Sequence, residues 1–147
     1  MKNVLFVCIH NSARSQMTEA FLNDSGKHHF NAESAGIESG KLNPVVVEVM
    51  KEVGIDISNN KTKTVDDILA QGKSYDFVVT VCDTEAAERC PVFPGKGIRL
   101  HWSFEDPSAY QGGDEEKLIK TRIVRDEIKA AIHQFIADVN DGKYNIA

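Results

Sequence analysis

Short apolar runs and longer amphipathic segments alternate along the 147 residues of the chain. The apolar runs predict four strands, at about residues 2–7, 30–34, 75–81 and 98–102. The other segments predict helices at about residues 14–23, 45–53, 64–71 and 114–140. Strands that alternate with helices favour a parallel sheet with crossover helices, so the predicted fold class is α/β with a four-stranded parallel sheet.

Local signals mark the ends of several predicted helices. Asn43 before Pro44 is typical of an N-cap followed by proline at the first helical position. The valines that follow Pro44 favour a strand by propensity, so the helix prediction there depends largely on the cap. Thr64 and Asp67 have the spacing of a capping box. Residues 56–63 and 103–113 are predicted to be loops.

The C-terminal helix carries apolar residues spaced mostly three to five apart. We predict that this stripe belongs to the core and binds no ligand. Its members are Ile119, Ile123, Val124, Ile128, Ile132, Phe135 and Val139. The chain has no internal repeat or linker, and its length fits one domain over residues 1–147.

The most informative segment follows the first predicted strand. Cys8 ends the strand, five residues intervene, and a helix is predicted from Arg14. Such a turn directs backbone N–H groups and a helix N-terminus toward one point, which favours an anion and stabilises a thiolate. Arg14 can donate to two oxygens of an oxyanion, and Ser15 can donate to the thiolate. The alternative is a buried structural cysteine near a surface arginine.

Two further segments are predicted to meet this loop. In an open α/β sheet, ligands bind beyond the carboxyl ends of the strands. Cys82 follows the third predicted strand, and Trp102 and the loop with Asp106 follow the fourth. We therefore expect these segments at the same edge of the sheet as Cys8.

Charge and hydropathy limit the partners of the protein. The net charge of −5 argues against nucleic acid and requires any anion site to be local. No signal peptide is recognisable, and no apolar run approaches the roughly 18 residues of a membrane span. We therefore expect a cytoplasmic protein that does not engage a membrane, in a compartment where thiols are mostly reduced.

The second and third cysteines indicate redox chemistry or a structural role. The chain has no Cys-x2-Cys pair and its histidines lack ligand spacing, so no metal site is expected. If the segment from Cys82 to Cys90 is helical, its ends lie about 12 Å apart, whereas a disulfide needs about 7 Å or less. A disulfide would therefore require unwinding, which would expose the bond to an external reductant. The alternative is that Cys82 is a buried residue at the end of a strand and that Cys90 is an incidental surface residue.

The Cys-x5-Arg-Ser pattern resembles the low-molecular-weight tyrosine phosphatase superfamily, which includes phosphatases and arsenate reductases. With cysteines at all three places, the whole chain resembles the arsenate reductases that use three catalytic cysteines and are recycled by thioredoxin. The matching segments are residues 7–17, 34–37, 55–59, 78–82, 90–91, 101–102, 106–107 and 122–128. The resemblance implies one three-layer α/β/α domain around the parallel sheet and supports the helix after Pro44.

The resemblance also implies roles for the site residues. Those with a catalytic role are Cys8, Arg14, Ser15, Cys82, Cys90 and Asp106. Arsenate is expected to bind to His10, Asn11, Ser12, Ala13, Arg14 and Ser15. The first cysteine is the nucleophile, the other two continue a disulfide relay, and Asp106 is the general acid. No tightly bound cofactor is implied. Thioredoxin is the expected reductant, with glutaredoxin or glutathione as the alternative, and nothing requires more than a monomer.

Two departures from the family pattern matter. The third cysteine follows the second by eight residues here rather than seven. Some relatives bind a potassium ion beneath the loop, through an acidic residue and residues matching Asn11, Glu19 and Ser34. Lys63 takes the acidic residue's place in this chain. Its ammonium could replace the ion and pair with Glu19, so we expect no potassium requirement.

Two other functions fit part of the pattern. A low-molecular-weight protein tyrosine phosphatase would hydrolyse phosphotyrosine through a phospho-intermediate on Cys8. It would leave Cys82 and Cys90 without a purpose, and such phosphatases often have a second cysteine where this chain has Ala13. The non-enzyme alternative is an oxyanion- or redox-sensing adaptor, but no recognition module or basic patch supports it.

Overall fold

We describe the protein from a computed structural model that defines residues 1–38, 40–82 and 97–144. The strands are β1 (Lys2–Cys8), β2 (Phe30–Gly36), β3 (Phe77–Thr80) and β4 (Ile98–His101). The helices are α1 (Arg14–Ser25), α2 (Pro44–Lys51), α3 (Val65–Ala70), the 3₁₀ helix η1 (Pro107–Ala109) and α4 (Asp114–Asn140). All strand pairs are parallel, in the order β2-β1-β3-β4. The predicted fold class is confirmed.

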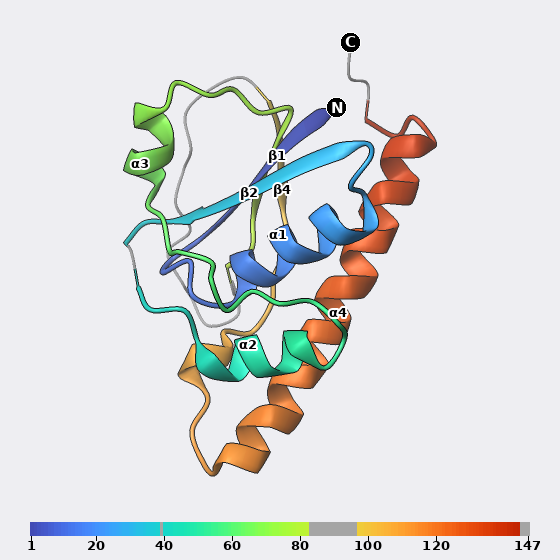
Figure 1. Ribbon diagram of the computed structural model, residues 1–147. Coiled ribbons are helices and arrows are strands. Elements are labelled where there is room, and N and C mark those ends of the chain that lie inside the picture. The colour runs from blue at the N-terminus through green and yellow to red at the C-terminus, as the bar shows by residue number, and fades with distance from the viewer. Residues whose placement is uncertain (39, 83–96, 145–147) are drawn as a thin grey trace.

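Helices lie on both sides of this sheet (Figure 1). Along β1, Phe6 and Cys8 face a core that also contains side chains of α1, α2 and α4. Leu5 and Val7 face the opposite side, where they pack with Ile68 of α3. Successive side chains of a strand point to opposite faces, so an unbroken apolar run is what a central strand with two covered faces requires.

An aromatic cluster anchors the C-terminal half of α4 to the sheet. The ring centroid of Phe135 lies 5.0 Å from that of Phe77 and 5.6 Å from that of Trp102, both in edge-on geometry. Such aromatic pairs add to the stability gained by burying their area. Trp102 is the first residue after β4. The cluster therefore fixes the start of the loop that carries Asp106.

The prediction that the whole apolar stripe of α4 is core was wrong for Ile119 and Ile123, which are 50% and 57% exposed. The buried side of α4 is formed by Thr121, Val124, Arg125, Ile128, Ile132 and Phe135. Ile123 and Ile128 are five positions apart, which corresponds to about 140° around a helix. Ile119 is likewise five positions before Val124, so both isoleucines point away from the buried side of the helix and face solvent.

Several local predictions were accurate. The Asn43 side chain caps α2 by accepting a hydrogen bond from Val45 N at 2.9 Å, and the Thr64–Asp67 capping box is present. Strand β3 is shorter than predicted, and η1 lies inside the predicted loop because Pro107 follows the capping Asp106. The predicted helix after Cys82, with Cys90, lies outside the described residues. Among the described residues, no helix has the length and apolar character to cross a membrane.

Candidate active site

The loop between β1 and α1 holds Cys8 in the interior of the protein. Cys8 ends β1 and is 2% exposed. At the turn of the loop, Asn11 has a positive φ of 55°, which asparagine tolerates better than most residues. The Asn11 backbone N–H donates to Cys8 Sγ at 3.2 Å. The local backbone thus directs a donor to the sulfur, and such donors favour a thiolate.

The hydroxyl of Ser15 is the second polar group on the sulfur. Ser15 Oγ lies 2.9 Å from Cys8 Sγ and also accepts a hydrogen bond from Asn11 Nδ2 at 2.7 Å. Because the amide nitrogen can only donate, the serine proton is left for Cys8. The hydrogen bond from Asn11 to Ser15 therefore leaves the serine free to make its predicted hydrogen bond to a Cys8 thiolate.

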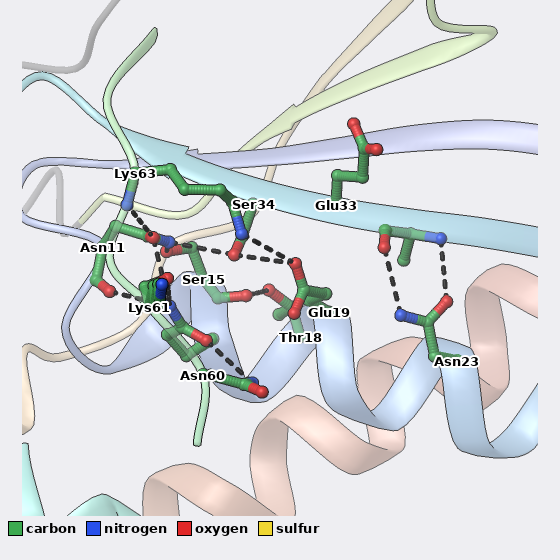
Figure 2. A network of polar contacts seen from close by, with 12 residues as sticks. Asn11, Ser15, Thr18, Glu19, Asn23, Glu33, Ser34, Asn60, Lys61 and Lys63 are labelled. Carbon is green, nitrogen blue, oxygen red and sulfur yellow. Dashed lines mark hydrogen bonds and ion pairs between the residues drawn. The ribbon is translucent and has the colours of Figure 1, made fainter. Parts of the chain in front are cut away.

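The amide of Asn11 connects the loop to three other segments (Figure 2). Asn11 Nδ2 also donates to Ser34 Oγ of β2 at 2.9 Å. Asn11 Oδ1 accepts from Gln16 Nε2 at 3.1 Å and from the Lys63 backbone N–H at 2.9 Å. Both ends of the amide are thus occupied twice, which fixes the orientation of the side chain and the shape of the loop.

The pair between Lys63 and Glu19 is present beneath the loop (Figure 2). Lys63 Nζ lies 3.7 Å from Glu19 Oε1, and Ser34 Oγ donates to the same oxygen at 3.1 Å. Burial raises the pKa of Glu19 above its ordinary value of 4.5, although Lys63 and Ser34 act to lower it. Across the described part of the chain, no three His, Cys, Asp or Glu side chains form a group that could hold a metal ion.

Gly36 of β2 packs directly against the loop between β1 and α1. It pairs with Cys8 in the sheet. A Cβ atom at this position would lie 2.7 Å from the Ile9 carbonyl oxygen and 2.8 Å from the Asn11 backbone nitrogen. Both contacts are shorter than real Cβ contacts, so the loop and β2 can approach this closely only with glycine at position 36.

Arg14 and Asp106 meet as expected. Arg14 is 2% exposed, its Nη2 lies 3.5 Å from Asp106 Oδ2, and its Nη1 donates to the Phe104 carbonyl oxygen at 3.2 Å. Asp106 Oδ1 accepts from the Ser108 backbone N–H at 2.9 Å and so caps η1. The loop that carries Asp106 therefore packs against Arg14 of the loop between β1 and α1 (the anion loop), which places a carboxyl group beside the predicted oxyanion site.

The other residues predicted to bind substrate differ in exposure. Ser12 and Ala13 are buried. The imidazole of His10 is exposed and lies 3.9 Å from the Glu38 carboxylate. Gln16, which was not predicted as a site residue, is a buried amide that also donates to the Asn11 carbonyl oxygen at 3.2 Å. A polar residue in the first turn of a helix gives no periodic signal, so only its contacts reveal its role.

Cys82 is fully buried and follows β3, which lies next to β1. The Val81 backbone N–H donates to the Val7 carbonyl oxygen at 2.9 Å, so the pairing continues beyond the strand. Cys8 and Cys82 therefore leave neighbouring strands at the same edge of the sheet. Cys90 lies outside the described residues.

Comparisons with known proteins agree with this arrangement. The sequence profile of the low-molecular-weight phosphotyrosine protein phosphatase family matches residues 3–144. The chain belongs to this family. Its curated relatives include the arsenate reductase of Halalkalibacterium halodurans, which is 45% identical over 138 residues that cover 91% of this chain and 94% of that protein. The phosphatase family thus includes relatives that carry the name of a reductase.

Solved structures agree as well. An arsenate reductase in a phosphate-binding state superposes with a TM-score of 0.72 and 34% identity, covering 94% of this chain and 98% of that one. The thioredoxin-dependent arsenate reductase of Corynebacterium glutamicum superposes with a TM-score of 0.59 and 27% identity, covering 91% of this chain and 63% of that one. Both structural similarities extend over more than nine-tenths of the present chain.

Proposed function

We propose that this protein is an arsenate reductase that uses Cys8, Cys82 and Cys90 in sequence and is recycled by thioredoxin. The observation that carries the proposal is the placement of Cys82 at the same sheet edge as Cys8, just beyond the end of the neighbouring strand. Hydrolysis of a phosphate ester needs only the first cysteine, whereas reduction needs a second thiol within reach. The names of the curated and structural relatives support the same activity.

The first step joins arsenate to the enzyme. Arg14 and the backbone N–H groups of the loop bind the oxyanion. The Cys8 thiolate attacks arsenic and forms a sulfur–arsenic bond, while one arsenic–oxygen bond breaks. Asp106 protonates the departing oxygen, which leaves as water because hydroxide is a poor leaving group. Ser15 stabilises the thiolate before the attack.

The next steps transfer two electrons to arsenic. The Cys82 thiolate attacks Cys8 Sγ, the electron pair of the sulfur–arsenic bond passes to arsenic, and arsenite leaves. A Cys8–Cys82 disulfide remains. The Cys90 thiolate then attacks Cys82 Sγ, which releases the Cys8 thiolate and forms a Cys82–Cys90 disulfide. The dithiol of thioredoxin reduces this disulfide and is itself oxidised; glutaredoxin with glutathione is the alternative reductant.

The test is NADPH oxidation with arsenate, thioredoxin and thioredoxin reductase. We expect sustained NADPH oxidation by the wild type and none by Cys8→Ser or Cys82→Ser. Cys90→Ser should release one equivalent of arsenite per enzyme and then stall without NADPH oxidation, because its Cys8–Cys82 disulfide is not passed on to thioredoxin. Mass spectrometry of the stalled variant should find a Cys8–Cys82 disulfide. Several turnovers by Cys90→Ser with thioredoxin alone would refute the order of the relay. Binding of arsenate without turnover by any reductant would favour an adaptor.

The family profile keeps a tyrosine phosphatase as the second candidate. It would use the same Cys8, Arg14 and Asp106, with water hydrolysing a phospho-intermediate on the cysteine. Hydrolysis of p-nitrophenyl phosphate, measured beside arsenate turnover, separates the two functions. Brisk hydrolysis that survives Cys82→Ser, with no arsenate turnover, would identify a phosphatase. Slow hydrolysis beside rapid arsenate turnover would be a side activity of the shared loop.

The compartment and oligomeric state follow from the proposed chemistry. A relay of free thiols must stay reduced between turnovers, so we place the enzyme in the cytoplasm. Cys8, Arg14 and Asp106 all come from one chain, so the first step requires no second subunit. A monomer is therefore the expected working form, and sedimentation of the purified protein would test this.

A further inference from the structure

The turn that carries Asp106 contacts the anion loop at a second point besides Arg14. Ser108 Oγ lies 3.3 Å from Ser12 Oγ of the anion loop and accepts a hydrogen bond from Asn43 Nδ2 at 3.1 Å. Figure 1 shows η1, which contains Ser108, beside the N-terminal end of α2. One hydroxyl therefore joins three segments that are far apart in the sequence.

Asn43 connects the same three segments from the other side. Its backbone N–H donates to the Ser12 carbonyl oxygen at 3.0 Å, and its side-chain oxygen caps α2 by accepting from Val45 N at 2.9 Å. The remaining amide nitrogen reaches Ser108. The amide is thus held by the loop and the helix before it meets the acid turn, so Ser108 docks against a preorganised partner.

Asp106 has few other constraints. Its carboxylate is partly exposed and contacts the Ser108 backbone N–H and Arg14. The hydrogen bond to Ser108 is local and moves together with the turn. Once substrate binds, the Arg14 guanidinium must also donate hydrogen bonds to the oxyanion and is shared between the anion and the turn. Among the described residues, the contact of Ser108 with Asn43 then helps to keep the acid turn in place during the reaction, beside the Ser108–Ser12 contact and the hydrogen bond from Arg14 to the Phe104 carbonyl oxygen.

We infer that Ser108 is a positioning residue for the general acid, and that its hydroxyl, held by Asn43, latches the Asp106 turn to the anion loop. This inference rests on the proposed function only in that Asp106 acts as the acid, a role that the reductase and the phosphatase share. General acid catalysis requires the acid within hydrogen-bond reach of the proton acceptor, so a loosened turn slows the chemical step. The oxyanion contacts of the loop stay intact.

The central variant is Ser108→Ala, which keeps the backbone N–H that bonds Asp106. We expect kcat for arsenate to fall about five- to twentyfold, while protection of Cys8 from iodoacetamide by inorganic phosphate stays at its wild-type midpoint. Ser108→Thr retains the hydroxyl and should restore kcat. Asn43→Ser keeps the N-cap of α2 but is too short to reach Ser108, and should resemble Ser108→Ala. Ser25→Ala removes an exposed hydroxyl that contacts His133 and serves as the matched control.

A double-mutant cycle separates positioning from general loosening. If Ser108 acts through Asp106, adding Ser108→Ala to Asp106→Asn should change kcat by less than about twofold. An equal loss in both backgrounds, an unchanged kcat in Ser108→Ala, or a shifted phosphate midpoint would overturn the inference. If the wild type reduces no arsenate, the proposed function fails, and the same cycle is read from p-nitrophenyl phosphate hydrolysis. If Asp106→Asn changes neither reaction, the latch has no acid to position and the inference is wrong.

Discussion

The guanidinium of Arg14 lies 3.5 Å from the carboxylate of Asp106, and this contact joins the anion loop to the acid turn. Arg14 uses a second nitrogen to hold the Phe104 carbonyl oxygen of the same turn. Only a planar side chain with several donors can make both contacts and still bind two oxygens of a tetrahedral anion. The arginine therefore has a structural role beside its proposed role in anion binding.

The first prediction is that Arg14→Lys weakens anion binding although the charge is kept. An ammonium cannot reproduce the forked contact, and a hydrogen bond to a charged group contributes about 1.5–3 kcal/mol. We expect the midpoint for phosphate protection of Cys8 to rise about 10- to 100-fold. Arg122→Lys, which alters a surface contact with Glu52, is the matched control. A wild-type midpoint in Arg14→Lys would contradict the assignment.

The second prediction concerns Ser15 and the reactivity of Cys8. Removing the hydroxyl in Ser15→Ala deletes a hydrogen bond to the thiolate and should slow alkylation of Cys8 by iodoacetamide at pH 7 about tenfold. The rate is followed by mass spectrometry, with the protein folded throughout. Cys82 is also buried, so peptide mapping must assign the modified cysteine. Alkylation of Cys8 at the wild-type rate would mean that Asn11 N–H alone stabilises the thiolate.

The third prediction concerns the cation beneath the loop. In Lys63→Met the Glu19 carboxylate loses its ammonium partner, and we expect about 1–2 kcal/mol lower stability at pH 7. Because the pKa of Glu19 is raised, the carboxylate form costs stability as pH rises through that pKa, and the loss should shrink at pH 4, where a carboxyl group with a pKa above 4.5 is mostly protonated. Urea unfolding at both values measures the difference.

Activity and stability in potassium chloride would show whether the Lys63 ammonium takes the place of a bound potassium ion or only pairs with Glu19. We expect the wild type to show no gain in activity or stability in potassium over sodium chloride, and Lys63→Met to show one. Lys61→Met, two residues away with an exposed side chain, is the control. Strong potassium stimulation of the wild type would show that the Lys63 ammonium does not take the place of the ion.

The fourth prediction is a pH-dependent contribution from Glu33, on β2. Burial acts to raise its pKa, but hydrogen bonds from Lys73 and Tyr75 outweigh it, so the pKa lies below 4.5. Such a group stabilises the fold above its unfolded pKa, and this stability is lost as pH falls through the lowered value. Glu33→Gln should cost about 0.5–1 kcal/mol at pH 7 and progressively less below pH 4.5. A cost that is independent of pH would contradict the assignment.

The fifth prediction uses the two glycines before α4. Gly113 caps the helix without a side-chain hydrogen bond, has a negative φ of −76° and has open space for a Cβ atom. Gly113→Ser should therefore raise the free energy of unfolding by a few tenths of a kcal/mol. Gly112 has a φ of 111°, and a Cβ atom there would meet the Glu116 carboxylate. Gly112→Ser should lower stability by about 1 kcal/mol or more, and equal effects of the two changes would refute the capping argument.

Much of the fold and part of the site could be predicted because their signals are local. The strand before Cys8, the cap at Asn43 and the capping box at Thr64 each depend on residues within a few positions. Ile119 and Ile123 could not be placed correctly, because apolar spacing does not reveal which side of a long helix faces the sheet. The tertiary arrangement decides that.

The contacts that organise the acid turn were also beyond sequence reasoning. Ser12, Asn43 and Ser108 meet only because three loops end at the same edge of the sheet. Hydroxyl and amide side chains are common in loops, and their partners follow from the positions of the loops rather than from spacing. The roles proposed for Cys8 and Arg14 could be formulated from the sequence because both residues lie in one short segment.

The close approach at Gly36 has a consequence for genetic experiments on this enzyme. A side chain at position 36 would push against backbone atoms of Ile9, His10 and Asn11, which would have to shift to admit it. We therefore expect a library screened for soluble expression to retain only a few small substitutions at this position, each with a shifted loop. A selection for growth on arsenate should retain glycine alone, so the two libraries should disagree even at a residue that has no reactive group.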